Sequence, residues 1–464
     1  MDKTKNLTIS ALTILVLAII FSVSLVSAAT LYVTSITQFT NQTSDINTNT
    51  TAGPIQGAID AANPGDSIRV AAGVYSNSIN ITKVNNITIY SQSGAASTTI
   101  QNNSDTVIRI GNLSGGTNII LDGFSINSTR NGTETPVKTI SYGVVIYQFN
   151  VTIKNSVFNN NNVSIYVDST ITNITLGSIT NNTFSNMTSG GGAILLQTFF
   201  NNISGVTISK NTFSHLNITN YGINITGNNT IPNLNALTNY TGDTFDITID
   251  SNFINATKHG ITVYNVTSIT ITNNNITNLS TNGIEILALR AVQKLATNLY
   301  NHTITIQNNN ISGSGSAGIN FCSVGIGYYN TTTTVIDENA FSANNVRGIT
   351  YACTDKGTTM LNATNNYWGD ISGPSNETAS VGVFASLGTS ANGNITYIPW
   401  YQDGMTSILH SIVLNGVHYN TIQNAINNAS AGNTITVGAG IYKNRWVNIT
   451  QANNIVLNAS QRAS

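Results

Sequence analysis

A phrase of alternating apolar and polar residues recurs along most of the chain, and it constrains the fold more than any other feature. The phrase reads VTIKNSVF from Val151, SITNNTF from Ser178, VTISKNTF from Val206, ITIDSNFI from Ile247, ITITNNNI from Ile269 and ITIQNNNI from Ile304. A second phrase, which opens on glycine, lies between these copies, as in GVVIY at Gly143 and GITVY at Gly260. Period-two alternation is the pattern of short β-strands, so two strands per repeat are visible.

The spacing of the repeats predicts a solenoid. From Gly192 to Gly348, successive glycines of the second phrase are between 23 residues (Gly260 to Gly283) and 38 residues (Gly222 to Gly260) apart, which is the range of solenoid repeats. Strands this short cannot form a stable sheet alone, but stacked coils pair each strand with its equivalents above and below. A β-propeller or β-sandwich would need antiparallel hairpins with two-residue Asn-Gly or Asp-Gly turns, which do not recur. We therefore expect an all-β, right-handed parallel β-helix.

Asparagine follows the alternating triplet in the copies of the first phrase. It tolerates the left-handed backbone that a sharp corner needs, and its amide can bond to the same asparagine one coil away. We expect a corner ladder rather than ligand sites from Asn155, Asn182, Asn211, Asn252, Asn274 and Asn309.

A capping pattern occurs twice. The segment TAGPIQGAIDAANPGDSIRVAAGVY from Thr51 places Ile55, Ala58 and Ile59 on one helical face before an Asn-Pro-Gly stop. A short helix here would cover the open end of the β-helix, whose apolar strand edge would otherwise invite aggregation. The pattern returns as TIQNAINNASAGNTITVGAGIY from Thr421 at an offset of 367 residues, which indicates the start of a second β-helix.

These signals divide the chain into four parts. They are a signal peptide (1–28), a linker (29–50), a parallel β-helix domain with an N-terminal cap (51–405) and the start of a second, truncated β-helix (406–464). In the first part, Lys3 and Lys5 precede an apolar stretch from Ala11 to Val26 that closes on small residues, the layout of an export signal. We expect a secreted or cell-surface protein with no membrane span after signal removal.

Charge is scarce in this chain. Charged residues make up 8% of the sequence and the formal net charge is −1, whereas about 25% of residues are charged in ordinary globular proteins. Phosphate binding needs clustered lysine and arginine, so nucleic acid is excluded as a partner. A copper site would need grouped methionine and histidine, but the four Met and five His do not group.

Three segments carry a family resemblance. NNYWGDISGP from Asn365 and NITYIPWYQDG from Asn394 resemble the closing coil of adhesin-like right-handed β-helix surface proteins of methanogenic archaea. IQGAIDAANPGDSIRVAAGVY from Ile55 is similar to the entry segment of the wider pectin-lyase-like superfamily. The resemblance implies a secreted envelope protein whose β-helix is a spacer or an adhesive surface for glycans or other cell-envelope components. The separate wall-binding module of such relatives has no match here, which leaves the mode of anchoring open.

Lyases of the superfamily imply a rival hypothesis. They use a calcium site of several acids and a basic residue that removes the proton beside a uronate carboxylate. The nearest candidates here are Asp246, Asp250, Lys258 beside His259, and Glu285 one coil later. Isolated solvated charges explain these residues more simply. We expect no catalytic residue, metal site or cofactor, with calcium needed only under the lyase alternative.

Other candidate sites lie at strand ends and in expected loops. Tyr328 and Tyr329, in a Gly-rich loop, can stack on sugar rings. Cys322 and Cys353 end strands of adjacent coils, so we expect a disulfide between them, although their one-residue offset would turn them to opposite faces without an intervening turn. The glycosylation candidates are the sequons at Asn131, Asn330 and Asn376.

The leading expectation is therefore a non-catalytic, adhesin-like protein that presents an extended β-helix surface to glycans or neighbouring cells. The alternative is a polysaccharide lyase or hydrolase of the same superfamily.

Overall fold

The computed structural model of the chain describes residues 28–460 apart from the following segments. These are 42–52, 83, 85, 112–117, 130–139, 148–149, 170–173, 176, 188–191, 198–202, 215, 217–220, 228–244, 256, 265, 267, 288–302, 322–333, 343, 345–346, 352–360, 371–372, 377–387, 393–394, 403–410, 443–446 and 451–453.

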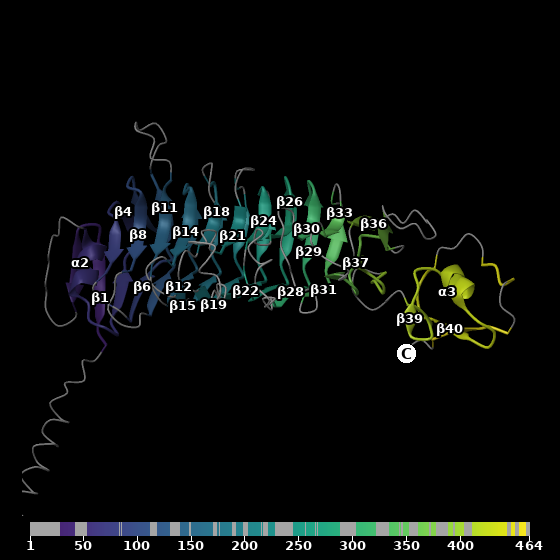
Figure 1. Cartoon of the computed structure of the whole chain (residues 1–464). Coiled ribbons are helices and arrows are strands. Elements are labelled where there is room, and N and C mark those ends of the chain that lie inside the picture. The colour runs from purple at the N-terminus through teal and green to yellow at the C-terminus, as the bar shows by residue number, and fades with distance from the viewer. Residues whose placement is uncertain are drawn as a thin grey trace, which may run out of the picture.

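The chain winds through three sheets in rotation, so that each coil adds one strand to sheet A, one to sheet B and one to sheet C (Figure 1). Sheet A contains β2 (Gln38–Asn41), β1 (Thr30–Ser35), β3 (Ser67–Val70), β6 (Ile87–Ser91), β9 (Ile119–Asp122), β12 (Val151–Lys154), β16 (Ser178–Thr180), β19 (Ile203–Ser209), β22 (Phe245–Asp250), β25 (Ser268–Thr272), β28 (Thr303–Gln307) and β31 (Thr334–Asp337), with β15 (Ile174–Thr175) beside β19. Apart from the terminal β1–β2 pair, neighbouring strands of these sheets are parallel, which confirms the predicted parallel β-helix.

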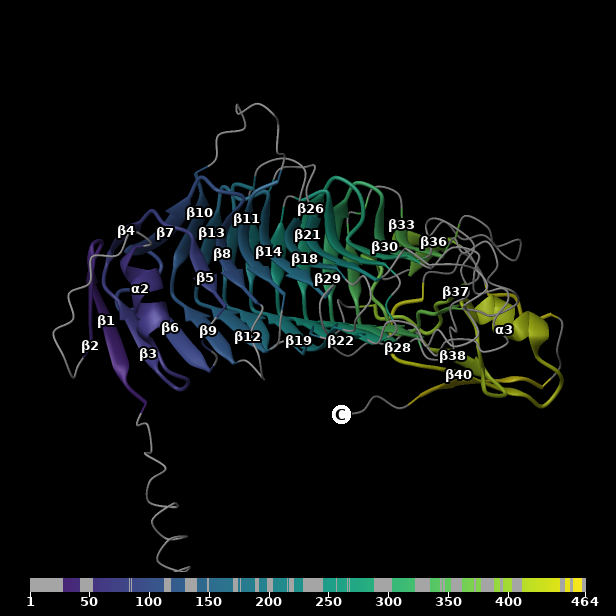
Figure 2. The same ribbon diagram turned by 60° about the vertical axis from the view of Figure 1, so that its left-hand side comes forward.

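Sheets B and C complete each coil. Sheet B contains β4 (Gly73–Tyr75), β7 (Thr98–Asn102), β10 (Ser125–Ser128), β13 (Val157–Asn159), β17 (Thr183–Ser185), β20 (Thr212–Ser214), β23 (Phe253–Asn255), β26 (Asn275–Leu279), β29 (Asn310–Ser314) and β32 (Ala340–Ser342). Sheet C contains β5 (Ile79–Ile81), β8 (Thr106–Ile110), β11 (Tyr142–Ile146), β14 (Val163–Asp168), β18 (Gly192–Gln197), β21 (Tyr221–Thr226), β24 (His259–Tyr264), β27 (Ile284–Leu287), β30 (Ala317–Phe321), β33 (Arg347–Tyr351), β36 (Gly388–Asn392) and β35 (Pro374–Asn376). In the turned view of Figure 2, the three sheets run along the full length of the stack.

Each full coil thus has three strands, where the sequence phrases indicated two. The first phrase spans two of them, because a single left-handed residue bends the chain from sheet A to sheet B. That residue has φ between 53° and 56° at Asn155, Asn181, Lys210, Ser251, Asn273, Asn308 and Glu338. The strand after this bend is only three to five residues long, so it is hard to separate from the corner in the sequence.

The residue after the left-handed one forms the asparagine ladder. In one step of the ladder, the Asn182 backbone N–H donates to Asn211 Oδ1 over 2.9 Å, and Asn182 Nδ2 donates to the same oxygen over 3.1 Å. The pattern continues through Asn182, Asn211, Asn252, Asn274, Asn309, Asn339 and Asn366, all buried. The predicted ladder is therefore present, with one correction at its start, where the ladder position is held by Ser156.

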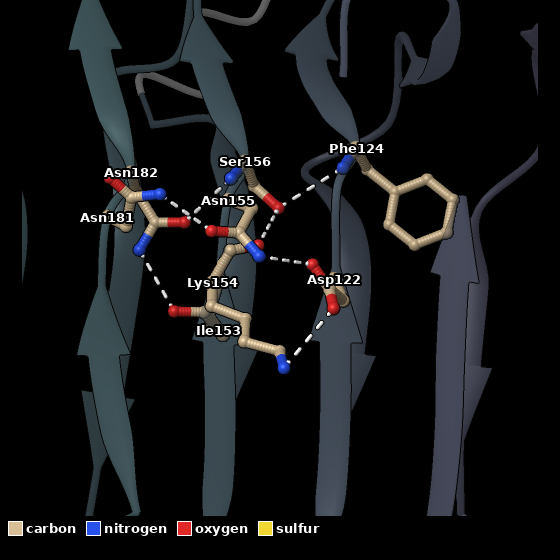
Figure 3. Close-up of polar contacts among 8 residues, drawn as sticks. All are labelled: Asp122, Phe124, Ile153, Lys154, Asn155, Ser156, Asn181 and Asn182. Carbon is tan, nitrogen blue, oxygen red and sulfur yellow. Dashed lines mark hydrogen bonds and ion pairs between the residues drawn. The ribbon is translucent and has the colours of Figure 1, made fainter. Parts of the chain in front are cut away.

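Figure 3 shows the start of the ladder. The Ser156 N–H donates to Asn182 Oδ1 over 3.0 Å, while Ser156 Oγ accepts from the Phe124 N–H over 3.2 Å. Asn155 instead occupies the left-handed position and donates from Nδ2 to Asp122 Oδ1 at the surface (2.7 Å). One asparagine was expected both to adopt the left-handed backbone of the corner and to form the ladder hydrogen bonds. In the structure, neighbouring residues divide these two roles.

The interior between the sheets is filled by aligned apolar side chains. Sheet A contributes a register-matched row of Ile153, Ile179, Ile208, Ile249, Ile271, Ile306 and Ile336. Sheet B contributes a stack of Phe158, Phe184 and Phe213, with ring centroids 5.0 and 4.7 Å apart. Because equivalent residues lie over one another, every coil buries its apolar side chains against the coils on both sides.

The N-terminal end is closed by a helix and a hairpin. α2 (Pro54–Ala61) buries Ile55, Ala58 and Ile59, as the sequence predicts. The preceding segment is not simply a linker, because β1 and β2 form an antiparallel pair and β1 adds to sheet A beside β3. Leu31 and Val33 of β1 are buried in the core, and this burial fixes the segment on the first coil.

The C-terminal region has its own small core. After β34 (Leu361–Asn362) and β37 (Ile395–Thr396) come β38 (Ile412–Leu414), β39 (Val417–His418), α3 (Ile422–Asn428), β40 (Thr434–Val437) and β41 (Val456–Ala459). Ile412, Leu414, Ala425, Ile426 and Ile435 pack together within this group. We call residues 411–460 the C-terminal module.

Candidate functional site

The outer face of sheet C gathers aromatic and titratable side chains. Alternate residues of a strand point to opposite faces, so one register row of this sheet faces away from the core. That row contains Val145, Tyr166, Leu195, Asn224, Thr262, Glu285, Asn320 and Thr350. At the start of the strands, Tyr221 is in register with His259, whose imidazole lies beside the outward Glu285.

Half-buried tyrosines lie along this face. Tyr142 and Tyr166 stack with centroids 5.1 Å apart. The Tyr166 hydroxyl lies within hydrogen-bonding distance of Asp168 Oδ2 (3.4 Å) and Gln197 Oε1 (3.2 Å). Burial raises the pKa of Tyr166 far above its ordinary value, and Asp168 adds to the rise. The side chain is therefore held as a neutral phenol.

Histidine and glutamate meet on the next coils of the same face. His259 Nδ1 lies 3.1 Å from Glu285 Oε2 at an ion-pair distance, without the angle of a hydrogen bond. Glu285 Oε1 accepts from Asn282 Nδ2 over 3.0 Å and from Asn320 Nδ2 over 3.2 Å. Both ionisable side chains are about nine-tenths buried, at 10% and 11% exposure. We call these four residues together with Tyr221 the His–Glu cluster.

Tyr221 links the His–Glu cluster to a cation. Its ring stacks on the imidazole of His259 at a centroid distance of 5.0 Å and an interplanar angle of 9°. Lys258 Nζ lies 5.8 Å from the centroid of the Tyr221 ring. Burial lowers the pKa of His259 below 6.5, and Lys258 adds to this, although Glu285 opposes it. The imidazole is thus predominantly neutral near pH 7.

This shift predicts a pH-dependent stability. Below pH 6.5 the unfolded chain binds a proton at His259 more readily than the folded chain does. The free energy of unfolding therefore decreases as the pH is lowered, until the pH falls below the folded-state pKa of His259. His259→Gln removes this contribution. Between about pH 8 and pH 5, the thermal midpoint of the wild type should fall by about 1–3 °C more than that of His259→Gln. Equal falls of the thermal midpoint in the two proteins would contradict the lowered pKa of His259.

The four residues of the lyase hypothesis do not come together. Asp246 and Asp250 lie on β22 of sheet A, whereas Glu285 lies on β27 of sheet C and Lys258 precedes β24 of sheet C. Glu285 and Lys258 instead belong to the surroundings of His259, as described above. The sequence grouped them with the two aspartates because their order along the chain does not tell which sheet each strand joins.

Asp250 has a local structural role. Burial opposes its ionisation, but hydrogen bonds from Asn273, Ser251 and Thr272 outweigh that effect, and its pKa lies below the ordinary value. Asn273 Nδ2 and Thr272 Oγ1 both donate to Asp250 Oδ1, over 2.7 and 2.9 Å. Asp246 is exposed. Neither aspartate has a catalytic neighbour among the residues that the structure describes.

Several expected sites lie outside the described residues. They are the tyrosines Tyr328 and Tyr329, the cysteines Cys322 and Cys353, the sequons at Asn131 and Asn330, and residues 1–27 of the expected signal peptide. Asn376 ends strand β35. The pairing of the cysteines, the use of the sequons and the cleavage of a signal stay predictions.

Metal-binding and membrane-spanning features were also sought. Within the described ranges, no three His, Cys, Asp or Glu side chains gather in a way that could hold a metal ion. The helices in those ranges are too short and too polar to cross a membrane.

The sequence did not reveal Tyr166, Tyr221 and Asn282 as site residues. The available signal was weak, because a tyrosine at the edge of an alternating strand also suits ordinary sheet packing. Glu285 gave a better signal, since a charged residue inside the GIEIL phrase is unusual in a chain with 8% charged residues.

No family model matches the chain, and no curated protein matches it either. Solved structures with a similar fold include the A-module of mannuronan C-5 epimerase AlgE6 from Azotobacter vinelandii, at 14% identity and a TM-score of 0.44, over 74% of this chain and 94% of that one. The catalytic unit of a GH87 α-1,3-glucanase from Streptomyces thermodiastaticus matches at 14% identity and a TM-score of 0.34, over 76% and 67%. A PL6 polysaccharide lyase from Pseudopedobacter saltans matches at 12% identity and a TM-score of 0.28, over 76% and 91%. At these values the matches assign no activity to this chain.

Proposed function

We propose that the chain is a secreted polysaccharide-binding protein and that it binds its ligand along the outer face of sheet C. The observation that carries this proposal is the series of half-buried aromatic rings on that face, from Tyr142 and Tyr166 to Tyr221 and Tyr264. Tyrosine combines an apolar ring face, which stacks on the apolar face of a sugar, with a hydroxyl that hydrogen-bonds.

Amide side chains beside the rings supply the polar part of such a site. Asn224 and Asn320 lie in the outward row of sheet C, and Gln197 lies beside Tyr166. Amides both donate and accept, so they can bond to sugar hydroxyls in either direction. The adhesin-like role that the family resemblance implies would follow from weak binding repeated over many coils.

Replacing the tyrosines should weaken glycan binding. We expect Tyr166→Ala and Tyr221→Ala each to lower affinity about tenfold, or about 1.4 kcal/mol, because each removes one stacking surface. A glycan array would identify the ligand, and titration calorimetry on the best hit would measure the loss. Tyr90→Ala is the matched control, since Tyr90 is a half-buried tyrosine on sheet A. Equal losses in all three variants, or no glycan bound by the wild type, would contradict the proposal.

A second candidate function rests on the His–Glu cluster. A carboxylate 3.1 Å from Nδ1 favours a proton on that nitrogen, which leaves a lone pair on Nε2, and this is the form of histidine that acts as a general base. The chain would then be a polysaccharide lyase or hydrolase whose acid–base residue is His259. Assays for unsaturated uronates and for new reducing ends, with His259→Gln as reference, separate this candidate from binding alone. Calcium would be included as a condition for the lyase reaction.

A further inference from the structure

The C-terminal module repeats the N-terminal cap down to its hydrogen bonds. Gln56 Nε2 donates to the Asn80 carbonyl over 3.1 Å, and Gln56 Oε1 accepts from the Asn80 N–H over 2.7 Å. Gln423 makes the same two bonds with Asn448, over 3.0 and 2.6 Å. The sequence offset of 367 to 368 residues therefore joins residues in equivalent structural positions, and α3, β40 and β41 correspond to α2, β3 and β6.

Equivalent apolar residues differ sharply in exposure. In the first β-helix they are covered, with Ile79, Ile81 and Ile89 at 3%, 0% and 1% exposure. Their equivalents Val447, Ile449 and Leu457 are exposed at 43%, 50% and 41%. A neighbouring pair serves as an internal reference, because Val74 and Ile441 are both exposed, at 51% and 64%. The difference thus affects only the side chains that face inward in the first β-helix.

The first cap is covered by the coil that follows it. β5 pairs with β8, and β6 pairs with β9 at the edge opposite β3. In the C-terminal module, β41 pairs with β40, and residues 447–449, which correspond to β5, form no strand. In the first β-helix the second coil thus covers the cap, whereas 447–449 and the outer edge of β41 pair with no strand among the described residues.

Gln402 binds the C-terminal module at Ile441. Gln402 Oε1 accepts from the Ile441 N–H over 2.9 Å, and Gln402 Nε2 donates to the Ile441 carbonyl over 3.2 Å. In the first β-helix the Gly73 N–H donates to the Ser97 carbonyl, so the backbone groups of the next residue, Val74, point away from β7. By this equivalence Gln402 binds Ile441 on the side opposite the second coil. We call Val447, Ile449 and the outer edge of β41, which pairs with no strand among the described residues, the open face.

We propose that the open face is a docking surface for one further parallel β-helix coil, with the alternating apolar pattern of residues 97–128. Such a coil would add one strand beside 447–449 and one beside β41, as β8 and β9 do in the first β-helix. Its inward isoleucine and leucine side chains would cover Ile449 and Leu457. An edge strand with exposed apolar side chains is otherwise a site of uncontrolled pairing.

The experiment adds this coil to the full chain. Residues Ser97–Ser128 are appended after Ser464, which continues the offset of 368 residues in frame. We expect hydrogen exchange of the Val447, Ile449, Leu457 and Ala459 amides to slow about tenfold or more, because the added strands would protect them by pairing. The Asn448 and Val456 amides already donate, to Gln423 Oε1 and to the Asn433 carbonyl. The matched control carries the same extension with the counterparts of Ile108, Ile110 and Leu121 replaced by asparagine, and it should give no protection. Exchange at Ile249 and Ile271 reports whether the main β-helix stays folded in both proteins.

Two results would overturn the proposal. One is equal exchange with the apolar extension and its asparagine control while the main β-helix stays protected. The other is a dimer of the unmodified chain, measured by light scattering, that Leu457→Lys abolishes and Ile36→Lys leaves intact. Ile36 is exposed at 57% at the other end of the stack. That outcome would assign the open face to a second copy of the chain instead.

Discussion

Replacing Asn274 by leucine is expected to lower the free energy of unfolding by about 3–5 kcal/mol. Asn274 Oδ1 accepts from the N–H and from Nδ2 of Asn252, over 3.0 and 2.9 Å. Asn274 Nδ2 donates to the Ile249 carbonyl and to Asn309 Oδ1, both over 2.9 Å. Leucine has a similar size but removes these four buried hydrogen bonds, and the Asn252 N–H loses the acceptor that it has here. Denaturant unfolding followed by circular dichroism would measure the loss.

The next residue provides the matched control for this prediction. Asn275 opens β26 with its side chain half-buried, and its Oδ1 accepts a surface hydrogen bond from Asn310 over 3.2 Å. Asn275→Leu should therefore change the free energy of unfolding by about 0.5 kcal/mol or less. Equal losses of stability in Asn274→Leu and Asn275→Leu would show that the buried ladder hydrogen bonds contribute no more to stability than a surface hydrogen bond.

Replacing Gly283 by alanine is expected to cost about 2–4 kcal/mol of stability. A Cβ atom at this position would lie 2.4 Å from the Gly318 carbonyl oxygen and 2.5 Å from Ile311 Cγ2. The oxygen belongs to the backbone of the next coil, so it can move only if the coils separate. Thermal and denaturant unfolding would both report the loss.

Gly192 is the matched control, because the structure has space there for an added Cβ atom. It opens β18 of sheet C, but a Cβ atom there would lie 3.4 Å from the nearest atom, the Tyr221 carbonyl oxygen. Gly192→Ala should change the stability by less than about 1 kcal/mol. A large loss in this variant would show that glycine is needed for its backbone freedom rather than for the close approach of coils.

Much of the fold could be predicted because the repeat itself encodes it. Alternation marks the strands, and the recurrence of isoleucine, asparagine and glycine in the same order marks their stacking. The number of strands in each coil could not be read in the same way. Whether the chain turns at Asn155 or one residue later depends on backbone angles, and both Asn155 and Ser156 are residue types that suit a corner.

The candidate site was harder to predict than the fold. The pairing of His259 with Glu285 requires that 26 residues bring the chain once around the solenoid, whereas other coils contain long additional segments. Because the loops vary in length, the spacing of residues in the sequence does not show which strands are neighbours in the structure. The two aspartates on β22 are nearer to His259 in the sequence than Glu285 is, yet they lie on a different sheet.

The single-residue bend between sheets A and B also bears on how such a chain can change in evolution. Successive ladder residues are 22 residues apart from Asn252 to Asn274 and 41 apart from Asn211 to Asn252, yet they form the same hydrogen bonds. Inserted sequence is thus absorbed elsewhere in the coil, while an insertion at the bend would turn the following side chains to the wrong face. The heritable unit of this architecture is a whole coil, which duplication can add or deletion remove without changing the coils on either side.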